Sequence, residues 1–224
     1  MRGHATAIPT TAPFVGLSEP LFTGQPVVVF GSGPLQDGLA GDSLAATLRS
    51  RVAAGANAGI RYADSIHRHA SVLATTSYLF RTAPPAPPTP APPTPTTHHP
   101  SLAKDDGEQR SLAMMQGVSV SALWLDTQCG PAEPAEDAMA AIGLSWGQLT
   151  AVSPRARSTV TVAATGIADC PLWVSTGVWL VCLAVVSGAS SVVTYGITGQ
   201  SRDHSGADTR ALDALRRLGV EVRL

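Results

Sequence analysis

The chain of 224 residues has a mass of 23.0 kDa and 44% hydrophobic residues, which is room for one α/β domain or two small ones and enough for a packed core. This composition excludes wholesale disorder. Charged residues make up only 14% of the chain, against a usual ~25% in soluble domains. The formal net charge of −1 and the lack of a basic cluster argue against a nucleic-acid binder, which needs an electropositive face to displace counterions from phosphates.

Cysteine usage and the amino-terminal segment indicate the compartment. The cysteines are odd in number and lack CxxC spacing, so they suggest neither a disulfide framework nor a zinc site: Cys129, Cys170 and Cys182. Residues 1–25 are expected to be an N-terminal extension, and Pro9, Pro13 and Pro20 interrupt the continuous apolar region that a secretory signal needs. We therefore expect a cytoplasmic protein, and the sequence suggests no metal site and no cofactor.

Residues 26–81 predict the first part of an α/β domain. Residues 27–30 form a β-branched run closed by Gly31, Ser32 and Gly33, the pattern of a buried strand that ends in a tight turn. Apolar residues at spacings of three and four predict a helix over 44–52, with Gly55 as its C-terminal stop. A second helix is expected over about 64–73.

Proline is concentrated in one place. Nine of the 18 prolines lie between residues 84 and 100, where there is almost no large apolar side chain. This segment cannot form a packed core, because proline removes backbone donors. We expect 82–104 to be an insertion or linker, and a docking ligand for an aromatic groove is the alternative. The adjacent His98 and His99 are interpreted as an incidental surface pair.

Residues 105–224 predict the second part of the same domain. Strands are expected over 118–125, 159–163, 191–197 and 220–224, and helices over 133–142 and 207–218. Strands and helices alternate, and this pattern favours an α/β fold in which helices cover both faces of a mostly parallel sheet.

One long stretch without charge raises the question of a membrane. From residue 171 to residue 201 there is no charged side chain, and 171–188 approaches the roughly 20 apolar residues that cross a bilayer. Ser175, Thr176 and Gly177 interrupt this stretch as a helix-start signal and leave too few apolar residues before Gly188 for a hydrocarbon core. A buried helix is favoured, and a membrane anchor through 171–188 is the alternative.

Two glycine-containing turns are candidate ligand sites. Gly31 and Gly33 leave backbone amides open to an anionic or nucleotide ligand, because glycine has no side chain to block the approach. A simple strand-to-loop turn explains the same residues, since Gln36 stands where the third glycine of GxGxxG would be. The turn at 175–177 precedes an apolar helix and would suit a phosphate, with a plain N-cap as the alternative.

A tetrapeptide suggests a different enzyme class. Gly41, Asp42, Ser43 and Leu44 spell the motif of GDSL-type esterases, whose serine is the nucleophile. Here the motif lies well past the first strand, and the Asp-x-x-His that those enzymes carry near the C-terminus does not follow. A helix cap explains the same residues better, so a hydrolase is kept only as an alternative.

His204 is the candidate for acid–base chemistry. It is the only histidine in the C-terminal half, and it sits between a strand and a helix near the carboxyl edge of the predicted sheet. Residues 205–208 look like a capping box that would hold it just outside the helix, facing the crevice where α/β sheets bind ligands. Imidazole suits general-base work because it titrates near neutral pH. An exposed loop histidine is the alternative.

Three blocks in order resemble the sialyltransferase-like glycosyltransferases that use CMP-sialic acid. The bacterial enzymes open with a strand followed by G-N-G-P-S, and here GSGPL follows residues 27–30. They later carry a T-S-G-like turn, an apolar helix and G-x-x-x-I-x-L-x-G-I-D, a plan that 175–198 follow. Their His-Ser before D-x-x-A-L-x-x-L is matched by His204 and Ser205 and then by 208–215. The matching blocks, 26–36 and 171–224, cover about a third of the chain.

This resemblance implies a single Rossmann-like α/β domain that transfers a sugar of the sialic acid type from a CMP-linked donor to a glycan or other hydroxyl acceptor, with inversion. His204 would take the proton from the acceptor hydroxyl. Two sets of residues would contact the donor: Gly31, Ser32 and Gly33 near the cytidine nucleotide, and Ser175, Thr176 and Gly177 near its ribose or phosphate.

The chain also departs from the family pattern. Ser32 and Leu35 stand where the family has Asn and Ser, and the Arg-x-Asn segment expected after the first helix has its best match at 61–64. Only residues 198–203 separate the strand end from His204, where the bacterial enzymes place a lid with tyrosines that support the phosphate. Arg202 would stand in for them by its charge. A noncatalytic nucleotide-binding relative is therefore the alternative function.

Overall fold

The computed structural model describes seven stretches of the chain: residues 22–33, 49–66, 72–80, 106–127, 132–168, 173–199 and 204–223. Several sequence predictions concern residues outside these stretches. They are most of the N-terminal extension, the GDSL tetrapeptide, the Pro-rich insertion and Arg202.

One sheet of seven parallel strands organises the chain, in the order β5-β4-β3-β2-β1-β6-β7. The strands are β1 Pro26–Phe30, β2 Val52–Ala56, β3 Val72–Thr76, β4 Ser119–Asp126, β5 Ser145–Val152, β6 Ser191–Tyr195 and β7 Glu221–Val222. The predicted parallel sheet is confirmed, and so are the strands that sequence analysis expected at β1, β4, β6 and β7.

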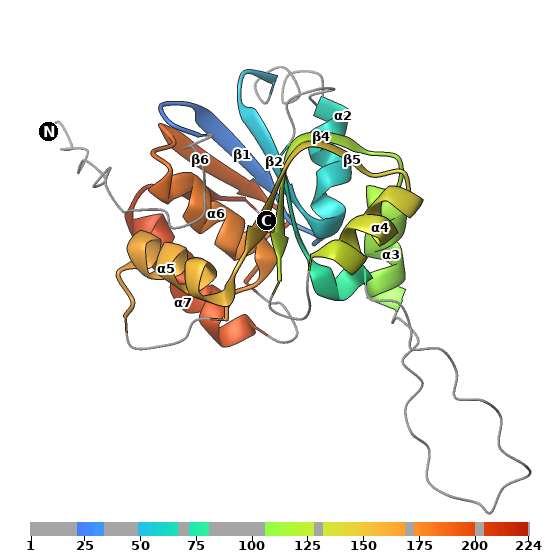
Figure 1. Cartoon of the computed structure of the whole chain (residues 1–224). Coiled ribbons are helices and arrows are strands. Elements are labelled where there is room, and N and C mark those ends of the chain that lie inside the picture. Colours follow the sequence, from blue (N-terminus) through green and yellow to red (C-terminus); the bar gives the residue numbers. More distant parts are fainter. Residues whose placement is uncertain are drawn as a thin grey trace, which may run out of the picture.

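Helices cover both faces of the sheet, as Figure 1 shows. One face carries α2 Ile60–Ile66, α3 Asp106–Met115 and α4 Glu133–Ala141, with the short 3-10 helices η1 Asn57–Gly59 and η2 Ser77–Phe80. The other carries α5 Pro154–Thr165, α6 Thr176–Val186 and α7 Ser205–Arg217. Alternate residues of β1 feed two cores, Val27 and Val29 on the α6 side and Val28 and Phe30 on the α2 side. The Rossmann-like α/β fold is thereby confirmed.

The strand order changes direction at β1. From β1 the chain builds outward through β2 to β5, and it then returns to add β6 on the other side of β1. The ends of β1 and β6 therefore lie side by side at a switch point, which is where open α/β sheets bind ligands.

The uncharged stretch is the central helix of one face. Ten of the eleven residues of α6 are buried, because the helix lies on β1, β2, β3 and β6 and is covered by α5 and α7. A helix that is apolar on all sides fits this place. Within the described stretches, no helix is both long enough and apolar enough to cross a membrane.

Two predicted helices in the first part of the chain differ from the structure in their ends. For the helix expected over 44–52 with a stop at Gly55, residues 44–48 lie outside the described stretches and residue 49 is helical, but residues 52–56 are the buried strand β2. The helix expected over about 64–73 is instead α2, Ile60–Ile66, and β3 begins at Val72. The strand β2 was missed because it consists mostly of small residues, which have little β propensity. Gly55 is required for close packing, since a Cβ there would lie 2.3 Å from the Cα of Ile60.

The strand predicted over 159–163 is also wrong, because these residues lie inside α5. Ser153 caps this helix by accepting a hydrogen bond from the Ala156 N–H at 3.2 Å, Pro154 opens it, and Gly166 ends it at φ 69°. The threonine hydroxyls bond back to carbonyls one turn earlier, as Thr161 does to Arg157 at 3.0 Å. These caps outweigh the β-branched composition that suggested a strand.

Gly59 provides a test of how tightly the end of β1 is packed. A Cβ on Gly59 would lie 2.2 Å from the carbonyl oxygen of Phe30, a backbone atom that cannot move aside. We expect Gly59→Ala to lower the free energy of unfolding by about 1–3 kcal/mol, the usual cost of overpacking, as measured by chemical denaturation. Gly206→Ala is the matched control, because nothing lies within 4 Å of its added Cβ. Equal stability of the two variants would contradict this packing.

Candidate functional site

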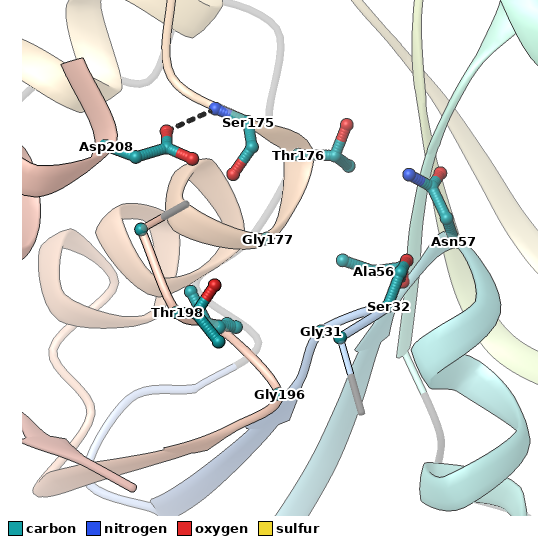
Figure 2. A pocket seen from close by; sticks show the side chains of 13 residues that line it. Gly31, Ser32, Ala56, Asn57, Ser175, Thr176, Gly177, Gly196, Thr198 and Asp208 are labelled. Atoms are coloured by element: carbon teal, nitrogen blue, oxygen red, sulfur yellow. Dashed lines mark hydrogen bonds between the residues drawn. The ribbon is translucent and has the colours of Figure 1, made fainter. Parts of the chain in front are cut away.

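A pocket of about 540 Å³ opens at the carboxyl ends of β1, β2 and β6, at the switch point of the sheet. Its lining comes from the turn after β1, the end of β2, the start of α6, the turn after β6 and the first turn of α7. In Figure 2 the residues of α6 and α7 face those of β1 and β2 across the cavity. The lining consists of Gly31, Ser32, Gly33, Ala56, Asn57, Ser175, Thr176, Gly177, Gly196, Ile197, Thr198, Gly199 and Asp208.

The turn after β1 packs on the turn after β6. The N–H groups of Gly31 and Gly33 donate to the carbonyls of Tyr195 and Gly196 at 2.8 and 3.0 Å. A Cβ at Gly31 would lie 2.4 Å from the carbonyl oxygen of Gly196. The expectation that these amides stand open to a ligand is therefore wrong, because both are bonded to the chain. The two glycines allow the two turns to approach each other and form one wall of the pocket.

Asn57 forms the opposite wall, directly after β2. Its φ of 49° lies in the left-handed region, which asparagine adopts more readily than most residues. Its Oδ1 accepts a hydrogen bond from Thr75 Oγ1 at 2.9 Å, which ties the ends of β2 and β3 together. In Figure 2 its side chain faces Thr176 across the cavity. Asn57 is thus a fixed polar group of the pocket.

The family pattern predicted an asparagine in another place. Its best match was at 61–64, but Arg61 does not line the pocket and donates instead to the carbonyls of Met114 and Gln116, at 3.1 and 2.7 Å. The signal for Asn57 was its position immediately after a buried strand, which was missed because Gly55 was interpreted as the stop of the preceding helix.

The start of α6 supplies hydrogen-bond donors to the pocket. Ser175 is the N-cap, with extended backbone (φ −60°, ψ 159°), and its Oγ accepts from the Val178 N–H at 3.4 Å, so the predicted helix start is confirmed. The N–H groups of Thr176 and Gly177 have no partner within the helix, as helix geometry requires of the first residues. Together with the positive end of the helix dipole, these donors favour an anion.

Asp208 joins α7 to the start of α6. Its Oδ1 accepts a hydrogen bond from the Ser175 N–H at 2.7 Å, and the residue is 1% exposed. It is the only ionisable residue in the lining that the described stretches provide. Sequence analysis assigned it to a capping box, but α7 begins at Ser205 with His204 as N-cap and without a side-chain capping bond there. The tertiary contact with Ser175 has no signal in local sequence.

A buried ion pair holds the segment before α6. Arg157 of α5 pairs with Asp126 at the end of β4 and also donates to the carbonyl of Val174. The side chain of Arg157 is 9% exposed and that of Asp126 is 6% exposed. Loss of either partner would therefore leave a buried charge uncompensated. The guanidinium lies 6.0 Å from the ring centroid of Trp179. The ion pair and Asp208 therefore fix the start of α6 from two sides.

The predicted site residues fall into three groups. Gly31, Ser32, Gly33, Ser175, Thr176 and Gly177 line the same pocket. His204 stands just outside α7 as predicted, partly buried, but it is not in the lining. Its carbonyl accepts a hydrogen bond from the N–H of Asp208, a lining residue, at 2.8 Å. Arg202 lies outside the described residues.

Thiol chemistry is not available in α6. Cys182 is buried, and burial, followed by the negative charge of Asp208, raises the pKa of its thiol to about 12. The thiol is therefore protonated at neutral pH and is a poor nucleophile and metal ligand. In the described part of the chain, no group of three or more His, Cys, Asp or Glu residues could hold a metal ion. The pocket offers backbone and hydroxyl donors, one amide and one carboxylate.

Comparison with known proteins does not assign the chain to a family. A scan against protein-family models finds no match, and neither does a search of curated proteins. The class of the protein therefore follows from its own structure: a Rossmann-like α/β domain with a pocket at the switch point of its sheet.

Proposed function

We propose that the pocket binds a CMP-linked sugar and that the protein is a sialyltransferase-like glycosyltransferase. The observation that carries this proposal is the convergence of residues 31–33 and 175–177 on one pocket. The resemblance assigns the first segment to the cytidine nucleotide and the second to its ribose or phosphate. Two halves of one donor site have to be neighbours, and these segments, far apart in the sequence, line the same cavity.

The phosphate of the donor would lie at the start of α6. The Thr176 and Gly177 amides point out of the first turn of that helix, and their dipole favours negative charge. Sugar and nucleotide hydroxyls would find hydroxyl, amide and carboxylate partners in the lining, of which Thr198, Asn57 and Asp208 are examples.

In the proposed reaction His204 acts as the general base. It accepts the proton of the acceptor hydroxyl while the hydroxyl oxygen forms a bond to the anomeric carbon of the sugar. The bond from that carbon to the phosphate oxygen breaks, and its electron pair leaves with CMP. Attack opposite the leaving group inverts the anomeric configuration. The positive end of α6 stabilises the charge that develops on the departing phosphate.

A noncatalytic nucleotide-binding protein is the second candidate. The observation that favours it is that His204, the N-cap residue of α7, is not in the lining of the pocket. Such a protein would keep the donor pocket and lack turnover. Binding and turnover therefore have to be measured separately.

The binding claim predicts a specific effect of charge at the start of α6. Gly177 is the second residue of α6, and its added Cβ would meet Ile197 at 3.4 Å and Ala56 at 3.8 Å, both in the lining. Aspartate there suits a helix N-terminus but puts a carboxylate where the phosphate would lie. We expect Gly177→Asp to weaken CMP binding by at least about tenfold, measured by thermal stabilisation with CMP, UMP, AMP and GMP.

Gly206→Asp is the matched control for that experiment. Gly206 is the second residue of α7, is exposed, and is absent from the lining, so the variant adds the same charge at the same helix position. We expect CMP to stabilise this variant as it does the wild type. Equal stabilisation of both variants, or no stabilisation of the wild type by any nucleotide, would contradict the proposal.

Turnover distinguishes the two candidates. With labelled CMP-sialic acid, we expect His204→Ala to slow donor hydrolysis or transfer by about 10²–10⁴-fold, the usual contribution of a general base. CMP binding should not change in this variant. Equal rates for the wild type and the variant would remove His204 from the mechanism, and CMP binding without any turnover would favour the noncatalytic protein.

A further inference from the structure

We propose that Thr75 is a positioning residue that turns the side-chain amide of Asn57 so that its N–H donors face the pocket. This inference rests on the proposed nucleotide pocket and assigns part of its preference for an anion to a residue outside the lining. Thr75 lies in β3, is 1% exposed, and donates a hydrogen bond from its Oγ1 to Asn57 Oδ1 at 2.9 Å.

This hydrogen bond determines which end of the Asn57 amide a ligand meets. An amide side chain has an acceptor oxygen at one end and an NH₂ group with two donors at the other. Because Oδ1 accepts from Thr75 on β3, the Nδ2 group is directed to the other side. In Figure 2 the nitrogen of Asn57 faces the cavity on the side of Thr176. Asn57 therefore presents donors to a ligand, and not an acceptor.

The burial of Thr75 disfavours the opposite orientation of the amide. Among the described residues, Asn57 is the only hydrogen-bond partner of the Thr75 side chain. If the amide were turned over, the Thr75 oxygen would accept from Nδ2, and its own O–H hydrogen would be buried without an acceptor. A buried donor without an acceptor costs free energy. Thr75 therefore selects one of the two orientations.

The selected orientation gives the pocket donors on two opposite walls. The first-turn amides of Thr176 and Gly177 form one wall, and the N–H groups of Asn57 face them from the other. A phosphate group can accept on both sides at once, because it carries acceptor oxygens in several directions. Hydrogen bonds from N–H groups to charged oxygens are also stronger than those between neutral groups. The two walls together therefore favour an oxyanion.

Loss of the Thr75 hydroxyl should weaken anion binding. Asn57 Oδ1 would lose its donor, and the amide would be free to turn this oxygen toward the pocket, where it repels a phosphate. Turning the amide back on binding would leave Oδ1 without a partner. The loss of one such hydrogen bond changes a binding constant by about tenfold.

Two substitutions at residue 75 separate the hydroxyl from packing. Thr75→Val keeps the branched shape and loses the hydroxyl, whereas Thr75→Ser keeps the hydroxyl and loses the methyl group. We expect calorimetry to show CMP binding about tenfold weaker in Thr75→Val and unchanged in Thr75→Ser. Thr194→Val is the matched control and should bind CMP as the wild type does. Thr194 is a fully buried residue of β6 outside the lining, and its hydroxyl has no partner in the described part of the chain.

A double-mutant cycle with Asn57→Gly tests whether Thr75 acts through Asn57. Glycine adopts the φ of 49° without strain, so this variant removes the amide and leaves the backbone conformation accessible. We expect Asn57→Gly to weaken CMP binding by about tenfold. In that background Thr75→Val should have no further effect, because the group that it positions is gone.

Three results overturn the role of Thr75 and leave the proposed function standing. The first is CMP binding by Thr75→Val that equals that of the wild type. The second is CMP binding that is as weak in Thr75→Ser as in Thr75→Val, since packing would then be responsible. The third is an equal loss from Thr75→Val with and without the Asn57 amide, since Thr75 would then act by another route.

Failure of the proposed function is recognised separately, by wild type that does not bind CMP. Inorganic phosphate then replaces CMP in the same measurements on the same proteins. The expected pattern among the variants, obtained with phosphate, supports the role of Thr75 without the nucleotide. Phosphate binding that Thr75→Val does not weaken overturns this role, and so does wild type that does not bind phosphate.

Discussion

The position of the first turn of α6 determines the site. This helix is buried on all sides and carries no charge. Two buried polar contacts tie the segment at its start to the neighbouring helices: Asp208 of α7 accepts from the Ser175 N–H, and Arg157 of α5, paired with Asp126, donates to the carbonyl of Val174. A buried charge without its partner costs free energy. These contacts therefore favour the position of the helix start in which both charges are paired. The donors of Thr176 and Gly177 are thereby aimed at the pocket.

The sheet places the remaining walls around that helix start. Because β6 is added beside β1 after the chain has built outward to β5, the turns after β1 and β6 meet at the switch point. Gly31 and Gly33 let these turns approach to hydrogen-bonding distance, while Asn57 is fixed across the cavity by Thr75. The stretch without charge, residues 171–201, contains the helix α6 and the strand β6, on which the pocket is built.

Sequence analysis succeeded where local chemistry decides the structure. The capping serine at 175 and the β-branched runs of β1 and β6 predicted their elements correctly, and alternation predicted the parallel sheet. It failed where tertiary packing or caps overrule local preference, as in β2, built from small residues, and in α5, rich in threonine. Six of the predicted site residues, 31–33 and 175–177, line one pocket. The first three follow β1 and the others start α6, and both segments lie at the carboxyl edge of the sheet. Asp208 was assigned only to local capping, because its bond to Ser175 joins residues far apart in the chain.

The central claim is that the pocket at the start of α6 holds the phosphate of a cytidine nucleotide. A crystal structure of the protein with CMP at saturating concentration tests it most directly. The account predicts the nucleotide in the pocket lined by residues 31–33 and 175–177, with phosphate oxygens about 3 Å from the amide nitrogens of Thr176 and Gly177. CMP bound elsewhere on the molecule, or a pocket that stays empty at saturation, would contradict it.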